Sequence, residues 1–433
     1  MATLTTHLEY ETNSTRAWFV TTGYLVRLLA SNPHRFDNVA YIIVDEVHER
    51  SVDTDLLCLL CKRLLDTNPL IRLVLMSATL AAALYRGYFN VDGPTIMVGA
   101  RLHPVQYKFV EDILEEGPNS NEMQYVATKS PNHIGQPPRR DYMHQLHIAV
   151  AQLATTIGAP GTSVLIFVAG MSDIMALTDL IDNFYVPGCR FSCFPIHGDI
   201  PFEEQMQVLD PPAEDEVKVV IATNAAESSI TLPDVDNVIC LGLCKQITYN
   251  PKSHRQMLVP AWISQASAEQ RAGRTGRVRP GTVYRVYSRE LFDQMSKYEV
   301  GEICRIPLDS VILLLKEILA ADEEVIPSLL NCLEPPNVGT IDRSFASLFR
   351  RHFITSPSDK SAITNLGKFV ASLGIDLALG ALVGLGIQFG VGAEAVQLSG
   401  VLSTTKDPWI MSNPMIHEAF DYNGKWNSAR LLN

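Results

Sequence analysis

Two adjacent acids, Asp45 and Glu46, directly follow the short apolar run Tyr41–Val44. In nucleoside triphosphatases an acid at the end of a buried strand can hold Mg²⁺, and a neighbouring carboxylate can orient or deprotonate the attacking water. A strand-end acid can equally well cap the helix that follows it. Taken alone, the pair leaves phosphoryl-transfer chemistry and a structural cap both open.

A basic run, Gln270-Arg-Ala-Gly-Arg-Thr-Gly-Arg277, could supply the other half of such chemistry. Its arginines recur at every third position and glycines separate them. Guanidinium groups spaced in this way can neutralise the charge that grows on a γ-phosphate during its transfer. From Lys245 to Arg289 there are nine Lys or Arg residues against one acid, Glu269, which is typical of a phosphate-facing surface. The alternative is a solvated basic loop.

These groups need a scaffold, and the apolar runs of the chain predict short buried parallel strands that alternate with amphipathic helices. The fold class is therefore α/β. The predicted strands are Ala17–Val20, Tyr41–Val44, Leu73–Met76, Val164–Val168, Val219–Ala222, Val238–Leu241 and Val283–Tyr287. Hydroxyl or amide side chains follow three of them, at Thr21, Ser77 and Thr223-Asn224. Ligands of open α/β sheets bind outside the carboxyl ends of the strands, so these residues are expected on one functional edge with the acids.

Composition limits the classes of protein that fit. The chain has 433 residues, 47% hydrophobic and 19% charged, with a formal net charge of −12. This predicts two to three packed domains at about 100–200 residues each and excludes disordered and fibrous classes. The acidic excess argues against a polybasic nucleic-acid wrapper, though not against a local basic groove. The apolar run at 377–393 contains five glycines and predicts a helix pair rather than a membrane span.

Cysteine usage points to the compartment. Eight cysteines and no apolar leader after Met1 predict a reducing intracellular location, cytoplasm or nucleus, without membrane association. Cys58 and Cys61 have zinc-knuckle spacing. They lie in an apolar helical run with no second Cys or His pair nearby, so they are predicted to be core cysteines.

Six segments resemble the motifs of the DEAH-box (DExH) ATP-dependent RNA helicases of superfamily 2. They are TTGYLVRLL at 21–29 (motif Ib), DEVH at 45–48 (II), SAT at 77–79 (III), VLIFVAGMSDI at 164–174 (IV), ATNAAESSITLPDV at 222–235 (V) and QRAGRTGRVRPG at 270–281 (VI). Their order and spacing also match, and the resemblance spans nearly the whole chain. Val47 and Pro233-Asp234 look closer to the branch that includes multi-domain DExH helicases than to splicing members.

The resemblance implies an enzyme that hydrolyses ATP with Mg²⁺. By that resemblance Asp45 coordinates the metal, and Glu46 acts on the attacking water. The other residues implied at the nucleotide or in coupling nucleotide state to RNA state are His48, Ser77, Thr79, Asp234, Gln270, Arg274 and Arg277. Arg274 and Arg277 take the arginine-finger role.

The resemblance also implies that the hydrolysis drives translocation or unwinding of RNA, or remodelling of ribonucleoproteins. The implied partner is single-stranded RNA, held through its backbone by Thr21, Gly23, Thr223 and Asn224. Backbone contacts of this kind give little sequence preference, which suits a motor.

The resemblance further implies a domain order of two RecA-like parallel-sheet domains followed by smaller helical ones. The expected parts are an incomplete first RecA-like domain at 1–114, a linker or insertion at 115–145, a second RecA-like domain at 146–297, a winged-helix domain at 298–360 and the start of a helical-bundle (ratchet) domain at 361–433.

The front of the chain departs from the family pattern. No GxxxxGK[ST] loop occurs in the 433 residues, so the chain is expected to be truncated at its N-terminus, before motif Ib. A shortened gene product and a degenerate paralogue both fit this. The second function class is accordingly a nucleotide-incompetent RNA-binding protein that retains the fold. Cys240, where the family usually has Asp, is a further departure.

Overall fold

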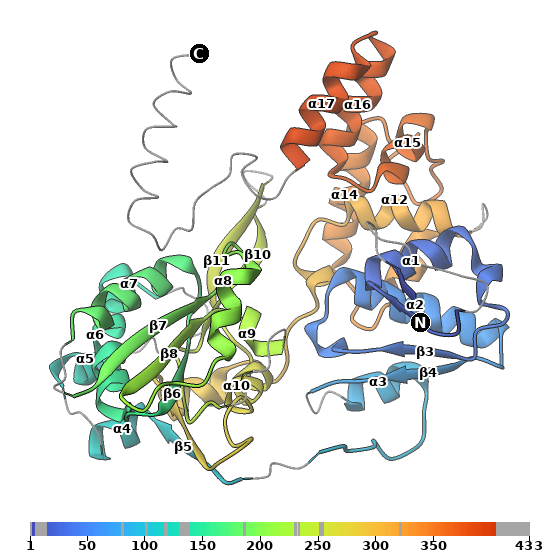
Figure 1. Ribbon diagram of the computed structural model, residues 1–433. Helices are drawn as coiled ribbons and strands as arrows, with labels where there is room; N and C mark the ends of the chain where they lie inside the picture. Colours follow the sequence, from blue (N-terminus) through green and yellow to red (C-terminus); the bar gives the residue numbers. More distant parts are fainter. Residues whose placement is uncertain are drawn as a thin grey trace, which may run out of the picture. The chain divides into compact units, whose positions relative to one another are not determined.

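The computed structural model describes residues 2–4, 15–78, 82–99, 103–116, 120–129, 138–184, 188–228, 232, 234–250, 255–319 and 323–403. The chain divides into two compact units (Figure 1). The first unit consists mainly of residues up to Pro94 together with residues from Val300 onward. The second consists mainly of Thr95–Thr248 and Met257–Glu299.

The second unit is built on a six-stranded parallel sheet in the order β5-β12-β9-β6-β8-β7. These strands are β5 (Val105–Phe109), β12 (Gly281–Arg285), β9 (Asn237–Cys240), β6 (Thr162–Phe167), β8 (Glu216–Ala222) and β7 (Arg190–Ile196). Alternate residues of β6 enter different cores: Val164 packs on one face of the sheet, and Leu165 packs on the other. Burial on both faces explains why the central strands are continuously apolar. The predicted α/β class is confirmed.

Helices cover this sheet. The helices on one face are α4 (Val110–Glu116), α5 (Asn121–Lys129), α6 (Arg140–Ile157) and α7 (Met171–Asp182) (Figure 1). Their apolar side chains belong to the core on that face. The remaining elements of this unit are α8 (Phe202–Gln205), the 3-10 turn at Met206–Leu209, α9 (Ala225–Ser228), α10 (Gln265–Ala272), α11 (Arg289–Gln294) and the two-stranded sheet of β10 (Leu243–Asn250) and β11 (Arg255–Trp262).

The first unit begins with two small parallel pairs, β1 (Ala2–Leu4) with β2 (Trp18–Val20) and β3 (Tyr41–Val44) with β4 (Arg72–Leu75). The helices of this region are α1 (Thr22–Ser31), α2 (Val52–Thr67) and α3 (Ala82–Phe89), with 3-10 turns at Pro33–Phe36 and Val47–Glu49. On β3, Ile42 and Val44 face the core, whereas Tyr41 and Ile43 are 63% and 60% exposed. In the described part of the chain, the β3–β4 pair is therefore covered on one face only.

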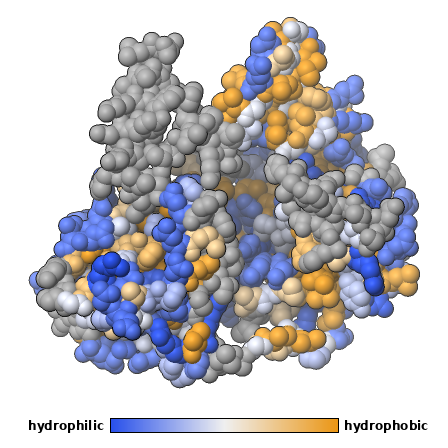
Figure 2. Space-filling view, in the orientation of Figure 1, coloured by the Kyte–Doolittle hydropathy of each residue, from blue (hydrophilic) through white to orange (hydrophobic). Residues whose placement is uncertain are grey.

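The rest of the first unit is helical. Its elements are the 3-10 turn at Glu302–Cys304, α12 (Asp309–Ile318), α13 (Val325–Leu330), α14 (Val338–Arg350), α15 (Asn365–Leu373), α16 (Leu377–Gln388) and α17 (Gly392–Ser403). The apolar run at 377–393 thus contains α16 and the first two residues of α17, and a turn after Gln388 interrupts it, as its glycines predict. Apolar side chains gather on the surface of this pair (Figure 2). Among the described residues no helix is both long enough and apolar enough to cross a membrane.

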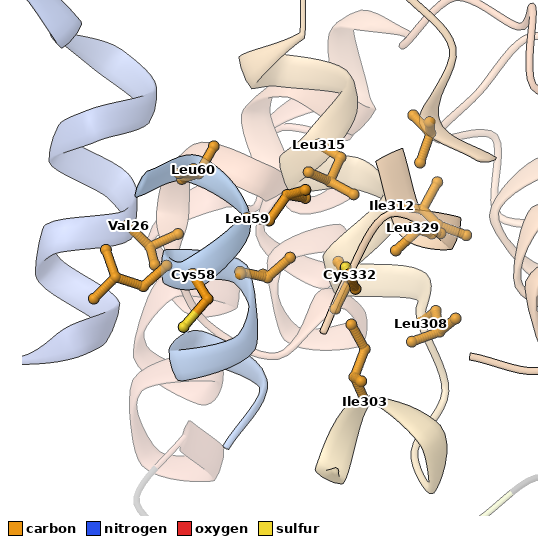
Figure 3. Close-up of a cluster of buried hydrophobic side chains, with 14 of the residues drawn as sticks. Val26, Cys58, Leu59, Leu60, Ile303, Leu308, Ile312, Leu315, Leu329 and Cys332 are labelled. Atoms are coloured by element: carbon orange, nitrogen blue, oxygen red, sulfur yellow. The ribbon is translucent and has the colours of Figure 1, made fainter. Parts of the chain in front are cut away.

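One hydrophobic core joins the N-terminal α/β part of the first unit to its helical part. Figure 3 shows Val26 of α1 and Cys58 of α2 in the same cluster as Ile303, Ile312 of α12 and Leu329 of α13. The expected first RecA-like, winged-helix and helical-bundle segments therefore share apolar side chains instead of burying separate cores.

The structure also differs from the expected limits of the first domain and the linker. β5, which lies inside 1–114, pairs with β12 in the register Val105 to Gly281 and so belongs to the second unit. The segment 115–145 contains α5 and the start of α6, and Met123 and Val126 of α5 are fully buried. Strand pairing across such a sequence separation leaves no local signal, and α5 is too short for its periodicity to stand out from polar surroundings.

Because Ile312 is fully buried in this shared core, its substitution by alanine should leave a cavity beneath both parts of the first unit. We expect Ile312→Ala to lower the free energy of unfolding of this unit by about 2–5 kcal/mol, measured by urea titration. Ile387→Ala, at a residue 57% exposed, is the control and should change it by less than about 1 kcal/mol. Equal effects would contradict the shared core.

Candidate functional site

The acid pair lies on a sharp turn at the carboxyl end of β3. Glu46 has φ 53° and ψ 36°, in the left-handed region, and a 3-10 turn at Val47–Glu49 follows it. Such a conformation is uncommon for a residue with a side chain, and it is concentrated at functional sites. Oδ1 of Asp45 accepts the Glu46 amide hydrogen at 2.9 Å. Asp45 is exposed and Glu46 half-buried, so a carboxylate is available to solvent at the strand end.

The predicted motif II and motif III residues are bonded to each other. The Val47 amide donates to the Met76 carbonyl at 3.1 Å, and the Ala78 amide donates to Nδ1 of His48 at 3.3 Å. Nδ1 of His48 also lies 3.3 Å from Oε2 of Glu46. That nitrogen can accept from Ala78 only when unprotonated and can donate to Glu46 only when protonated. The two contacts of His48 are therefore alternatives.

The other site residues predicted in the first unit are Ser77, Thr79, Thr21 and Gly23. Ser77 is exposed beside the turn, and Thr79 lies outside the described residues. Thr21 caps helix α1, where its side chain accepts the Tyr24 amide at 3.4 Å. A Cβ added to Gly23 would lie 2.6 Å from Oδ2 of Asp53, so glycine there leaves room for the Asp53 carboxylate. Thr21 and Gly23 thus have structural reasons for their residue types.

In the second unit, Thr223 and Asn224 follow β8 at the carboxyl edge of the sheet. Thr223 is buried and its amide donates to the Ile196 carbonyl at 3.3 Å. Asn224 is exposed, and its carbonyl accepts the Glu227 amide at 2.9 Å. These bonds hold the chain in the turn that begins α9, with the Asn224 side chain on the surface.

The basic run is organised around Glu227, a residue that the sequence did not single out. Nε2 of Gln270 donates to the Glu227 carbonyl at 3.2 Å, and Nη2 of Arg274 donates to the same oxygen. Nε of Arg271 donates to the Glu227 carboxylate at 3.1 Å. Nε of Arg277, half-buried, donates to the Gly273 carbonyl at 3.3 Å. Gln270 and Arg274 therefore share one acceptor.

Arg271 has a different environment from the other arginines because its side chain is fully buried. Its guanidinium lies over the Phe167 ring, 5.0 Å from the centroid, and Nη1 donates to the Leu243 carbonyl at 3.1 Å. Nη1 also lies 3.8 Å from Sγ of Cys240, the position where the family usually has Asp. Burial alone would lower the pKa of Arg271, but attraction to Glu227 raises it, so the guanidinium stays charged.

Asp234 lies at the opposite edge of the sheet from Thr223 and Asn224. Its Oδ2 accepts from Nζ of Lys218 at 2.7 Å and from Oγ of Ser163 at 3.2 Å, and both donors are near the amino ends of their strands. Lys218 is buried. This ion pair, buried on the lysine side, ties Asp234 to β8.

Metal ligation by cysteine finds no support in the described residues. Cys58 and Cys61 are both buried on α2, and burial raises the pKa of Cys61 to about 12. In the described part of the chain no three His, Cys, Asp or Glu side chains are grouped so that they could hold a metal ion. The two cysteines are core residues.

A protein-family model and individual curated proteins that are similar to this chain are all helicases. A helicase conserved C-terminal domain family matches residues 148–279. The DExH-box ATP-dependent RNA helicase DExH1 of Arabidopsis thaliana is 30% identical over 92% of this chain and 43% of its own length. The ATP-dependent RNA helicase DHX29 of Homo sapiens is 31% identical over 92% of this chain and 32% of its own. The chain therefore spans less than half the length of these relatives.

The fold is also similar to solved structures. The crystal structure of the E. coli DExH-box NTPase HrpB superposes with a TM-score of 0.76 over 97% of this chain and 47% of that one, at 22% sequence identity. An identity this low supports the fold alone. The parallel-sheet architecture described above is thus RecA-like.

The Arg271–Glu227 pair leads to a stability prediction. Glu227→Gln keeps the shape of the side chain but leaves a fully buried guanidinium without its counter-charge, so we expect the free energy of opening of the second unit to fall by roughly 3–5 kcal/mol. Amide hydrogen exchange in β6 and β8 measures it. Arg190→Gln is the control, because Arg190 pairs with Glu216 but its side chain is exposed. This substitution should lower the free energy of opening by less than about 1 kcal/mol.

Proposed function

We propose that this chain, which belongs to the DExH-box helicases of superfamily 2, acts as an ATP-dependent RNA helicase that couples ATP hydrolysis to movement along RNA or to remodelling of ribonucleoproteins. The observation that carries the proposal is the turn at residues 45–50, called the DEVH turn below, in which a strand-end acid pair is bonded through Val47 and His48 to the 76–78 segment. A merely structural cap would not need a strained acid and a shared histidine.

In this proposal Asp45 holds Mg²⁺. Its carboxylate is exposed, and the hydrogen bond from the Glu46 amide to Oδ1 leaves Oδ2 for a ligand. Mg²⁺ at phosphate sites usually takes one or two carboxylates, with phosphate oxygens and waters completing its shell, so this single acid fits the metal. The bound ion would neutralise charge on the triphosphate.

Glu46 is the residue that would orient or deprotonate the attacking water. His48 would respond to hydrolysis, because its Nδ1 can bond either to Glu46 or to the Ala78 amide but not to both. Ser77 and Thr79 would couple this change in the His48 contact to bound RNA. This sequence of contacts links the state of the acid to the backbone after β4.

Gln270, Arg274 and Arg277 would face the triphosphate, with Asp234 assigned to the nucleotide side as well. Gln270 and Arg274 are held on the Glu227 carbonyl, a neutral acceptor that a phosphate oxygen could replace. Charge-assisted bonds to phosphate are stronger than those to a carbonyl. Asp234 would act indirectly, because Lys218 and Ser163 already occupy its Oδ2.

The RNA would run along the exposed Asn224 and the residues beside it. Thr21, Gly23 and Thr223 complete the proposed set and would contribute backbone amides or hydroxyls to phosphates and sugars. Such a site takes single-stranded RNA of almost any sequence.

A nucleotide-incompetent RNA-binding protein is the second candidate. The observation that favours it is the lack of a GxxxxGK[ST] loop among the 433 residues. That loop supplies backbone amides and a lysine to the phosphates. An assay of hydrolysis separates the two candidates.

We expect Glu46→Gln to lower kcat for ATP hydrolysis by at least ~10²-fold, since water activation is typically worth that much. The assay uses an extended form, in which the GxxxxGK[ST]-bearing segment of a DExH-box relative precedes Met1. Nucleotide binding should persist, because Asp45 is unchanged. Glu49→Gln, an exposed acid of the same turn, serves as control. Near-normal turnover of Glu46→Gln would remove Glu46 from this role.

Residues 1–433 themselves should bind single-stranded RNA weakly and show no RNA-stimulated hydrolysis of ATP. Because the proposed contacts go to phosphates, the logarithm of the binding constant should fall linearly with the logarithm of salt concentration and differ little between oligo(A) and oligo(U). Fluorescence anisotropy measures both. The extended form should gain hydrolysis, and if it does not, the nucleotide-incompetent candidate is the better one.

A further inference from the structure

Arg50, at the end of the DEVH turn, is a buried charged residue to which neither the motifs nor the proposed chemistry assign a role. Its side chain is 5% exposed, and its backbone has φ 53°, in the left-handed region. Nε donates to Oδ1 of Asp55 at 2.9 Å and Nη2 donates to Oδ2 at 3.1 Å. Asp55, in the first turn of α2, is fully buried. The pair is therefore bidentate and shielded from water.

The same guanidinium reaches the distant helical part of the first unit. Nη2 of Arg50 donates to Oε2 of Glu334 at 3.2 Å, and that oxygen also accepts the Gly301 amide at 3.2 Å. A Cβ on Gly301 would lie 2.8 Å from Nη2 of Arg50, so a side chain at this position would displace the guanidinium. Arg50, Asp55 and Glu334 are called the ionic clamp below.

Backbone bonds reinforce the ionic clamp on the side of the turn. The Glu302 amide donates to the Arg50 carbonyl at 2.9 Å, and the Val52 amide donates to Oε2 of Glu302 at 3.1 Å. The last residue of the DEVH turn and the first residue of α2 are thus both tied to Glu302. These bonds join segments about 250 residues apart.

The energetics argue that stability alone does not account for this arrangement. Burial raises the pKa of Asp55, an effect that Arg50 partly offsets, and the clamp holds two acids against one base. Buried ion clusters are often no more stabilising than apolar residues of similar volume. What a bidentate, fully enclosed arginine does provide is a fixed geometry.

That geometry bears on the acid that would act on water. The DEVH turn is left-handed at both ends, at Glu46 and at Arg50, and such backbone persists only when its surroundings hold it. Met76 and Ala78 hold the Glu46 side through Val47 and His48. The clamp holds the other side.

We propose that Arg50, Asp55 and Glu334 are positioning residues for ATP hydrolysis: through them the helical segment after Val300 fixes the DEVH turn, and with it Glu46, in its working position. This inference rests on the proposed function for its catalytic consequence. Its structural part, the control of the turn by Glu334, stands independently and can be measured without hydrolysis.

The catalytic test uses Arg50→Lys, which keeps the charge but loses the planar fork, and Glu334→Gln, both in the extended form. Each should lower kcat at least ~10-fold while KM for ATP changes less than ~3-fold, because a misplaced catalytic group costs rate rather than binding. The double variant should be little worse than either single one, since the residues act as a unit.

The matched controls are Arg63→Lys and Glu323→Gln. Arg63 lies on α2 and pairs with Glu323 in the same helical segment, but both side chains are 41% exposed. These variants should keep kcat within ~2-fold. A fall in kcat equal to that of the clamp variants would overturn the proposal, because any link between α2 and the helical segment would then suffice.

The structural test uses residues 1–433 and amide hydrogen exchange. The Val47 and Glu49 amides, bonded to Met76 and Glu46, should exchange at least ~10-fold faster in Glu334→Gln than in the wild type. If the exchange rates of these two amides do not change in Glu334→Gln, the proposal that the ionic clamp fixes the turn is overturned, whether or not the protein hydrolyses ATP. Should Arg50→Lys fail to fold, Glu334→Gln decides alone, since Glu334 is partly exposed.

The outcomes separate the two hypotheses. If the extended wild type hydrolyses no ATP but Glu334→Gln speeds exchange in the turn, the proposed function fails and the clamp remains as a structural device without its catalytic consequence. If the wild type is active and the clamp variants lose thermal stability but keep kcat, the positioning role is overturned.

Discussion

Helix α2 is the constraint on which the first unit depends. Its residues Thr54–Cys61 are buried without interruption, whereas an ordinary surface helix buries only a stripe. A helical segment that is buried on all sides, as residues 54–61 are, must have packing partners on all sides. It therefore requires both α1 and β3 on the one hand and α12 and α13 on the other, which is why the N-terminal and helical parts of this unit share a core.

The enclosure of α2 also explains how a local turn comes to depend on distant residues. The DEVH turn leads directly into this helix, so whatever fixes the start of α2 fixes the turn. Arg50 and Asp55 lie at that start, and Glu302 and Glu334 meet them there. In the second unit Glu227 has a comparable place, because its carboxylate neutralises Arg271 inside the core while its carbonyl holds Gln270 and Arg274.

Local sequence patterns predicted the parts of the fold that depend on local physics. The central strands β6 and β8 are apolar because both faces are covered, and that produces a visible run of residues. The acids at 45–46 were predictable at a strand end because they follow the apolar run Tyr41–Val44, although the structure covers only one face of that strand. Pairings between distant segments were not, since β5 joins β12 and Arg50 joins Glu334 with no mark in the residues nearby. Asp234 illustrates a third case: its place beside the nucleotide stays a prediction from its motif, and its bond to Lys218 at the amino ends of the strands had no local signal.

The open face of the β3–β4 pair has a consequence for how the chain behaves in solution. Tyr41, Ile43, Val74 and Met76 are all exposed there, at a parallel sheet, a structure that proteins ordinarily cover on both sides. Contiguous apolar surface of this kind binds other apolar surface. In the described part of the chain the two-stranded β3–β4 sheet also has strand edges whose hydrogen-bonding groups add to the attraction. Light scattering from residues 1–433 should consequently rise with protein concentration and with lyotropic salt, and mild detergent should reverse the rise.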